Sequence, residues 1–208
     1  MLTQLKDDFI SEQEYLAGER NRQKKYELIN GEIYMMAGAS RKHNLLSKNM
    51  LVGFDNQLKQ KKSPCQVFSS DMKVRIQHND NVHFYYPDVV IACDDDNDSN
   101  DYFTEKPKLI VEVLSSSTRK MDKTMKMQDY IQIPSLEEYI LIEQSICEIS
   151  VLRRANNWQT SVYFLGDDIT FTSIGVTVAV EDIYYQVNNA DINQYLATQA
   201  LSESTSKK

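Results

Sequence analysis

The sequence predicts an α/β fold built around a mixed β-sheet. The strongest indication is a buried strand, a helix and a second buried strand in succession over residues 107–143, the order of a right-handed crossover between parallel strands. Shorter strand patterns on both sides of this unit indicate that antiparallel strands extend the sheet. Of the 208 residues, 41% are hydrophobic and 25% are charged, which is ordinary usage for a globular domain.

The first half of the chain carries clear boundary signals. Ser11 and Glu14 have capping-box spacing at the start of a helix, and Asn30-Gly31 is a strong hairpin signal. Ser40 is a plausible N-cap ahead of apolar residues at helical spacing. The expected elements are a helix over 9–19, a hairpin over 26–36, a helix over 40–60, and strands over 65–77 and 82–93 joined by a turn at 78–81.

In the second half, a proline marks one boundary clearly. Pro134 ends the helix that follows the first buried strand, because proline disfavours a helical residue before it. The expected elements are an acidic solvated loop over 94–101, a strand over 107–115, a helix over 117–132, a strand over 138–143, short strands or strand pieces to about 187, and a short helix over 191–200. We expect one domain over residues 1–190, followed by a short helix and disordered tail over 191–208.

The net charge of −7 at first argues against a polyanionic partner. Five of the acidic residues lie in the single segment 94–101, and without them the net charge would be −2. Basic residues gather at 20–25, 59–62 and 119–126, either as solvated surface or as phosphate contacts, and it is local clusters that attract phosphates. DNA therefore stays a candidate partner.

Composition also sets expectations for location. There is no apolar run of about 18 residues, so no membrane span is expected, and the acidic N-terminal residues argue against a signal peptide. The three cysteines, Cys65, Cys93 and Cys147, are scattered and odd in number. We expect them to be buried thiols in a reducing cytoplasm rather than parts of a disulfide framework or zinc cluster.

Charged residues within apolar strands are the most informative feature for function. Glu112 interrupts the buried strand, where a carboxylate costs several kcal/mol unless it has a partner or a metal. Asp88 stands at the entrance to another apolar run, so both carboxylates share a cleft if their strands are neighbours. Asp122 and Lys126 lie four residues apart on the following helix, and Lys126 is expected to reach that cleft. Two carboxylates and a lysine suit Mg²⁺- or Mn²⁺-assisted phosphodiester hydrolysis.

Each of these residues also has a structural interpretation. Asp88 would then cap a turn, and Glu112 would form a salt bridge with Lys126. Asp122 is expected to be a helix-surface partner of Lys126 rather than a metal ligand. The order of the residues, with one carboxylate on each of two strands and a lysine on a helix, favours a metal site over these separate interpretations.

The sequence resembles the Uma-two family of the PD-(D/E)XK nuclease superfamily. The resemblance is carried by YELINGEIYMMAGASRKHN, FSSDMKVRI, YYPDVVIAC, LIVEVLSSST, and DKTMKMQDY followed by PSLEEYILIE. These segments occur in the family's order and cover roughly residues 9–187. The resemblance implies a restriction-endonuclease-like αβββαβ core with additional antiparallel strands.

The resemblance also implies roles for particular residues. Asp88 matches the aspartate of the first half-motif and Glu112 the acidic residue of the second. The superfamily has lysine two positions later, where this chain has Leu114, and the match falls instead on Lys126 in the following helix. Glu27 matches a family acidic position, as a third carboxylate or outer-shell residue, with a hairpin salt bridge as the alternative.

Two further positions match the family. His43 matches a family histidine and is a candidate contact to phosphate or to a carboxylate, or an ordinary polar residue of a first helical turn. Asp71 also matches, and a hydrogen bond at the start of a strand is the preferred interpretation.

Two functions follow as hypotheses. The first is a Mg²⁺- or Mn²⁺-dependent endonuclease acting on DNA, with Asp88 and Glu112 as metal ligands and Lys126 and Glu27 completing the catalytic group. The alternative is an inactive nuclease fold that acts as a nucleic-acid-binding or protein-interaction module. A homodimer is plausible because cutting both strands usually needs two sites and the strand-rich C-terminal half offers edges for pairing.

Overall fold

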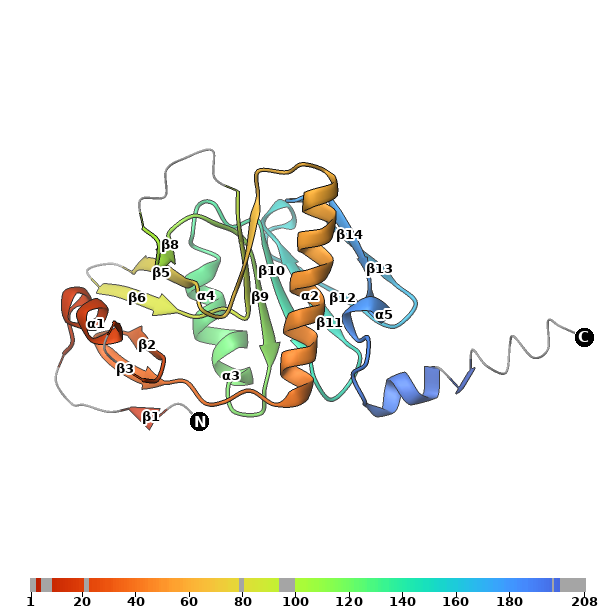
Figure 1. Cartoon of the computed structure of the whole chain (residues 1–208), viewed down its shortest axis with the longest axis horizontal. Helices are drawn as coiled ribbons and strands as arrows, with labels where there is room; N and C mark the ends of the chain where they lie inside the picture. The colour runs from red at the N-terminus through yellow and green to blue at the C-terminus, as the bar shows by residue number, and fades with distance from the viewer. Residues whose placement is uncertain are drawn as a thin grey trace, which may run out of the picture.

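The computed structural model describes residues 3–4, 9–20, 23–78, 81–93, 100–195 and 197–198. Two six-stranded sheets and a two-stranded sheet, with helices packed against them, form the fold (Figure 1). The α/β class and the mixed sheet predicted from the sequence are confirmed.

The sheet that carries most of the buried strands, which we call sheet B, contains the predicted crossover. Its strands are, in spatial order, β12 (Thr160–Tyr163), β11 (Ile149–Arg153), β10 (Glu138–Glu143), β9 (Pro107–Leu114), β7 (Val89–Ala92) and β4 (Gln66–Ser69). Strands β9 and β10 are parallel, with Ile140 beside Val111, and the other neighbours are antiparallel. Because β7 and β9 are neighbours, the condition set for the shared carboxylate cleft is met.

The second sheet, sheet A, is formed mainly by the N-terminal half of the chain. Its strands are, in spatial order, β1 (Thr3–Gln4), β3 (Glu32–Met35), β2 (Tyr26–Ile29), β6 (Asn81–Tyr85), β5 (Lys73–His78) and β8 (Phe103–Thr104). Strands β2 and β3 are the predicted hairpin. Asn30 and Gly31 at its tip have φ angles of 51° and 77°, the positive values that a tight two-residue hairpin requires.

Two segments that the sequence indicates as single strands each divide between the sheets. Residues 65–77 form β4 in sheet B and β5 in sheet A, and residues 82–93 form β6 in sheet A and β7 in sheet B. A turn separates the first pair, with the Met72 amide donating to the Ser69 carbonyl at 3.0 Å. Pro87, which has no amide hydrogen for a ladder, lies between the second pair and brings Asp88 to the start of β7.

The helices agree with the prediction more closely than the strands. They are α1 (Glu12–Glu19), α2 (Arg41–Gln60), α3 (Arg119–Met121), the π-helix η1 (Asp122–Lys126), α4 (Met127–Tyr130), the 3₁₀-helix η2 (Arg154–Asn156), α5 (Val180–Ile183) and a turn of helix over 190–195. The expected strand after residue 176 is only half correct, because β14 (Val176–Ala179) pairs with β13 (Asp168–Phe171) and then gives way to α5. Most of the acidic loop and the tail over 201–208 lie outside the described residues.

Alternation along β9 separates two apolar layers. Val111 and Val113 belong to the core cluster that includes α2, whereas Ile110 and Leu114 belong to the cluster formed with α4 and sheet A. Glu112 falls on the second face, as the period-two geometry of a strand requires. A carboxylate is therefore held in the layer between the two sheets.

Every helix in the described part of the chain falls short of the length and apolar character needed to cross a bilayer.

The prediction for the cysteines is wrong for two of the three. Cys65 and Cys93 form a disulfide, and only Cys147 is a free buried thiol. The two half-cystines flank the antiparallel partners β4 and β7, where Gln66 pairs with Ala92. Strand pairing therefore brings together cysteines that are 28 residues apart, and sequence spacing gives no sign of this contact.

Thiol counting will test this pairing directly. We expect one alkylated cysteine per chain when the protein is denatured without reductant, and three after reduction. Mass spectrometry of the alkylated protein gives the count, with the Cys65→Ser variant as control. Three reactive thiols before reduction, in protein purified under air, would contradict the bond.

Candidate active site

Glu112 is the carboxylate around which the candidate site is arranged. It lies near the end of β9 and is 4% exposed. Its Oε1 accepts hydrogen bonds from the Lys126 ammonium at 3.3 Å and from the Tyr130 hydroxyl at 3.1 Å. The buried carboxylate thus has the cationic partner that its cost of burial requires.

Lys126 joins three parts of the fold. Its Nζ lies 2.8 Å from Glu27 Oε1, 3.3 Å from Glu112 Oε1 and 3.5 Å from Asp122 Oδ1. These carboxylates come from β2, β9 and η1, and all four side chains are buried. The structure therefore gathers Glu27, Glu112 and Lys126 into one cluster, and Glu27 pairs across the sheets rather than within its hairpin.

The helix that supplies Asp122 and Lys126 is wider than expected. Residues 122–126 form a π-helix between two short α-helical segments, and single π turns occur often at functional sites. The Tyr139 hydroxyl donates to the Asp122 carbonyl at 2.9 Å, which attaches this turn to β10. Asp122 does pair with Lys126 as predicted, but it is 1% exposed, so its placement on the helix surface is wrong.

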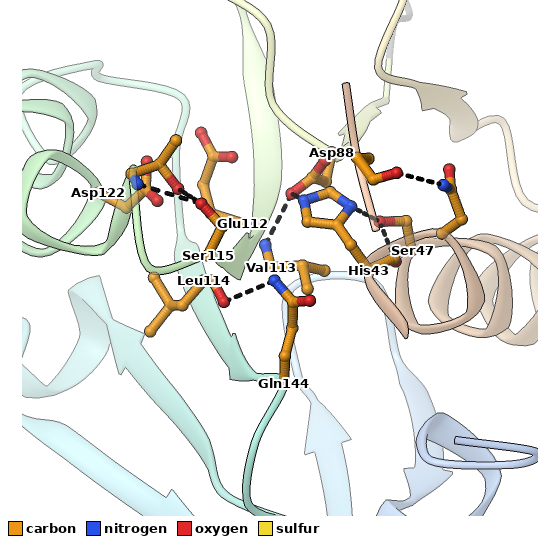
Figure 2. A network of polar contacts seen from close by, with 12 residues as sticks. His43, Ser47, Asp88, Glu112, Val113, Leu114, Ser115, Asp122 and Gln144 are labelled. Carbon is orange, nitrogen blue, oxygen red and sulfur yellow. Dashed lines mark hydrogen bonds and ion pairs between the residues drawn. The ribbon is translucent and has the colours of Figure 1, made fainter. Parts of the chain in front are cut away.

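Asp88 lies beside this cluster at a more open position. Val89 pairs with Val111 in antiparallel register, which places Asp88 level with Glu112 on the neighbouring strand. Its Oδ2 accepts from the Val113 amide at 2.7 Å and lies 3.1 Å from His43 Nε2 (Figure 2). The Asp88 and His43 side chains are 13% and 16% exposed, so the candidate site meets solvent here.

The start of α2 fixes the orientation of His43. Its amide donates to the Ser40 side chain at 3.1 Å, and its ring Nδ1 lies 3.4 Å from Ser47 Oγ. Ser40 also donates to Gln144 at 2.8 Å, and Gln144 donates to the Leu114 carbonyl at 2.8 Å. The N-terminus of α2 is thereby tied to the end of β9, and His43 is positioned against Asp88.

Burial and charge act in opposite directions within the cluster. Burial raises the pKa of Glu112 well above its usual value despite the opposing effect of Lys126, with Asp122 and Asp88 adding to the rise. Burial likewise raises the pKa of Asp122. For Lys126, burial alone lowers the pKa, but the charges of Glu112, Glu27 and Asp122 outweigh burial and raise it. The ammonium therefore stays charged at neutral pH, while Glu112 and Asp122 release their protons less readily than they would in water.

Aromatic residues that the sequence analysis did not identify complete the cluster. The Lys126 ammonium lies 5.4 Å from the centre of the Tyr85 ring, within range of a cation–π interaction. The Tyr85 hydroxyl donates to Asp129 at 2.6 Å, and His83 Nδ1 lies 2.8 Å from the same oxygen. Tyrosines in apolar strands and helices read as core residues, so only the packing reveals this support.

The carboxylate oxygens of the site match part of the coordination shell of a hard divalent cation. Asp88 and Glu112 offer carboxylate oxygens on adjacent strands, which suits Mg²⁺ or Mn²⁺. Asp122 Oδ1 is buried and accepts no hydrogen bond, although it forms an ion pair with Lys126. Within the described ranges, no group of three or more histidine, cysteine, aspartate or glutamate side chains is arranged to hold a metal. The residues therefore fit a cation that keeps several of its waters, as Mg²⁺ commonly does, rather than one fully enclosed by protein.

The mixed sheets and their helices agree with the restriction-endonuclease-like fold that the sequence resemblance implies. The aspartate before one strand and the glutamate in the next lie where that resemblance places them, whereas the lysine lies on the following helix and not two positions after the glutamate. The chain belongs to the Uma2 family, described as "Putative restriction endonuclease", whose model matches residues 12–180.

Individual relatives agree with this assignment. The uncharacterized protein slr1290 of Synechocystis sp. is 33% identical over 177 residues, which is 84% of this chain and 91% of that protein. A second uncharacterized protein of the same organism, sll1609, is 36% identical over 133 residues, 63% of this chain and 73% of its own length. A crystal structure titled as a "putative nuclease belonging to DUF820" from Anabaena variabilis superposes with a TM-score of 0.65 at 15% identity, covering 80% and 93% of the two chains, and supports the fold.

Proposed function

We propose that the protein is a metal-dependent endonuclease that hydrolyses phosphodiester bonds in DNA, with Mg²⁺ or Mn²⁺ held by Asp88 and Glu112. The observation that carries this proposal is the convergence of Glu27, Glu112 and Lys126 from three separate elements, beside an Asp88 that reaches solvent. A structural salt bridge needs one carboxylate for one lysine. Several buried carboxylates around one ammonium cost stability, and such an excess is typical of functional sites.

Each residue has a distinct part in the proposed reaction. A bound divalent cation would supply an activated water and charge neutralisation at the phosphate. The Lys126 ammonium would orient that water and stabilise negative charge as it develops on the phosphate oxygens. Glu27 pairs with Lys126 from β2, and His43 pairs with Asp88 from α2. Positive side chains at Arg41 and Lys42, which are exposed in the first turn of α2 beside His43, are suited to contact the DNA backbone.

A cleavage assay with a parallel binding measurement will test this proposal. We expect purified protein to cut DNA in the presence of Mg²⁺ or Mn²⁺ and to lose the activity in EDTA. The metal should also raise the melting temperature, because a ligand that binds only the folded state stabilises it. The Glu112→Gln variant should show neither effect, and an RNA substrate run in parallel would reveal a different preference.

The alternative is an inactive nuclease fold that binds nucleic acid or a protein partner. Its support is the saturation of Lys126 by carboxylates, together with the net charge of −7. This alternative predicts binding to DNA or a protein partner without cleavage and no metal-dependent shift in melting temperature. If wild-type protein behaves in this way under both metals, the endonuclease proposal is wrong.

A homodimer and a cytoplasmic location are parts of the same proposal. Strand β12 forms one edge of sheet B, and Val162 and Phe164 on and beside it are exposed, which offers a surface for pairing with a second copy. Light scattering after size exclusion should give about twice the mass of one chain. The Cys65–Cys93 disulfide is unusual for a reducing compartment, so an intact bond in protein alkylated before cell lysis would contradict the cytoplasmic part of the proposal.

A further inference from the structure

A pocket adjoins the candidate active site on the far side of Tyr86. It has a volume of about 170 Å³ and lies between the end of α1, the start of β5 and residues 100–103. The Tyr86 amide donates to Glu27 Oε1 at 3.1 Å, whereas the Tyr86 side chain lines the pocket. One residue thus separates the carboxylate cluster from the pocket.

The inner end of the pocket contains an ammonium with few acceptors. Lys73 is 6% exposed, and its Nζ lies 3.3 Å from the Tyr86 hydroxyl and 5.1 Å from the centre of that ring. The Tyr86 hydroxyl donates its own proton to Glu19 at 2.6 Å. Burial lowers the pKa of Lys73, although the charges of Glu19, which also lines the pocket, and of Asp71 oppose the change. An ammonium has three N–H donors, so Lys73 is placed to donate to a ligand that brings acceptor atoms.

The outer part of the pocket is aromatic and carries a second cation. Tyr102 is 57% exposed, and Phe103 and Leu16 continue the same wall. The Arg20 guanidinium lies 5.5 Å from the centre of the Tyr102 ring. Aromatic side chains of this kind stack on the flat face of a base, and a neighbouring arginine suits the phosphate that follows it.

The size of the pocket limits what enters it. A single water needs only about 10–15 Å³ of such space, whereas sites for drug-sized ligands begin near 300 Å³. The pocket therefore matches one flat ring system that carries acceptor atoms, with a charged group left outside near Arg20. A nucleobase with its phosphate has this combination of a ring, carbonyl or ring-nitrogen acceptors, and an adjoining negative charge.

We propose that this pocket receives one unpaired nucleobase of the substrate strand, so that single-stranded or locally unpaired DNA is the preferred substrate. The inference rests on the proposed nuclease function only in naming the source of the base. Taking a base out of a duplex costs a few kcal/mol, and the cost is least where the base is already unpaired. Unpaired DNA therefore enters the pocket at a lower cost than an intact duplex.

Base binding can be measured without cleavage. The probe is a single-stranded oligodeoxynucleotide with one 2-aminopurine, whose fluorescence changes when the base leaves its neighbours and stacks on protein. In full-length Glu112→Gln protein, we expect Tyr102→Ala to weaken the affinity for this probe by about tenfold, from the 1–3 kcal/mol that a stacked base contributes. The affinity for the same sequence as a duplex should change much less.

A matched control and a second variant keep the result interpretable. Tyr185 is 61% exposed and lies outside the pocket, so Tyr185→Ala should leave the affinity unchanged. Lys73→Met should weaken binding of the single strand as well, with folding checked by circular dichroism. Equal affinities for Tyr102→Ala and Tyr185→Ala would overturn the proposal. Displacement of the probe by free deoxynucleoside monophosphates at concentrations equal to that of the probe would also overturn it, by assigning the pocket to a free nucleotide.

The two proposals fail in different ways. If the wild-type protein cuts no DNA but Tyr102→Ala still weakens single-strand binding, the pocket inference stands and the nuclease function falls. If the wild-type protein cuts duplex and single strands equally and Tyr102→Ala has no effect, the nuclease function stands and the pocket inference falls.

Discussion

Lys126→Met will destabilise the protein at pH 7 by about 3 kcal/mol, within the range measured when one partner of a buried ion pair is removed. Methionine keeps most of the side-chain volume but leaves Glu27, Glu112 and Asp122 without the ammonium that now lies within 3.5 Å of all three. Folding is therefore penalised by uncompensated buried charge rather than by a cavity.

The pH dependence of this variant identifies the cause. The pKa values of Glu112 and Asp122 are already raised by burial, and Lys126 opposes the rise in both. Without Lys126 these two pKa values rise further. Between the pKa of the carboxyl group in the unfolded chain, near 4.5 for Glu112, and its raised pKa in the folded variant, the folded variant therefore binds more protons than the unfolded chain. Stability then increases as the pH falls through that window. The difference in free energy of unfolding between Lys126→Met and the wild type should therefore become smaller as the pH is lowered from 7 to 5.

Urea unfolding at a series of pH values gives the required free energies. Lys59→Met is a suitable control because Lys59 pairs with Asp55 at 2.6 Å on the exposed side of α2, where an ion pair contributes at most about 1 kcal/mol. A Lys126→Met deficit that stays constant with pH would mean that lost packing, and not the carboxylates, accounts for the effect.

This result would also refine an expectation taken from the sequence alone. From the motif, replacement of Lys126 by alanine is expected to lower the reaction rate and to leave metal binding largely intact. The structure shows that Lys126 is also the counter-ion of three buried carboxylates, so we expect its removal to affect folding as well as cleavage. Activity of the variant has to be compared at a pH where both proteins are folded.

The predicted residues Glu112, Lys126 and Asp88 follow from one local signal and the expected topology, whereas Glu27 and His43 were indicated only by the family resemblance. Glu112 is conspicuous because a carboxylate interrupts an apolar strand, and Lys126 is within reach because a crossover helix packs back onto the sheet. Asp88 follows once the two strands are taken as neighbours, which the β7–β9 pairing confirms. The conflict between the chemistry of Glu112 and its local pattern is visible without coordinates, and the other two residues follow from it through the expected topology.

The features that the sequence did not reveal depend on contacts between distant segments. Tyr130 and Tyr85 support the charged cluster through a hydroxyl and a ring face, but as sequence they are ordinary core residues. The division of residues 65–77 and 82–93 between two sheets follows from tertiary pairing, since each segment has the pattern of a strand over its whole length. The Cys65–Cys93 bond likewise follows from the alignment of β4 with β7.

Asp88→Asn will abolish metal-dependent cleavage while leaving the fold intact. The asparagine side-chain oxygen can still accept from the Val113 amide, which now donates to Asp88 at 2.7 Å, and the position is partly open to solvent, so we expect little change in stability. The loss of a charged metal ligand removes several kcal/mol of charge stabilisation, equivalent to a fall in rate of about 1000-fold or more. The metal-dependent rise in melting temperature should disappear with it.

A graded series separates binding of the metal from positioning of its ligand. His43→Ala keeps the Asp88 charge but removes the contact at 3.1 Å that orients it, and loss of such support typically costs about 10–100-fold. Asp71→Asn is the control, because Asp71 is exposed and pairs with Lys25 rather than with the cluster.

Initial cleavage rates and metal titrations followed by thermal shift should therefore rank wild type and Asp71→Asn first, His43→Ala second and Asp88→Asn last. If Asp88→Asn loses cleavage but keeps the full metal shift, the cation is bound without Asp88. Glu112 and the buried Asp122 oxygen, which lacks a hydrogen-bond donor, would then be the ligands, and Asp88 would act on the substrate instead.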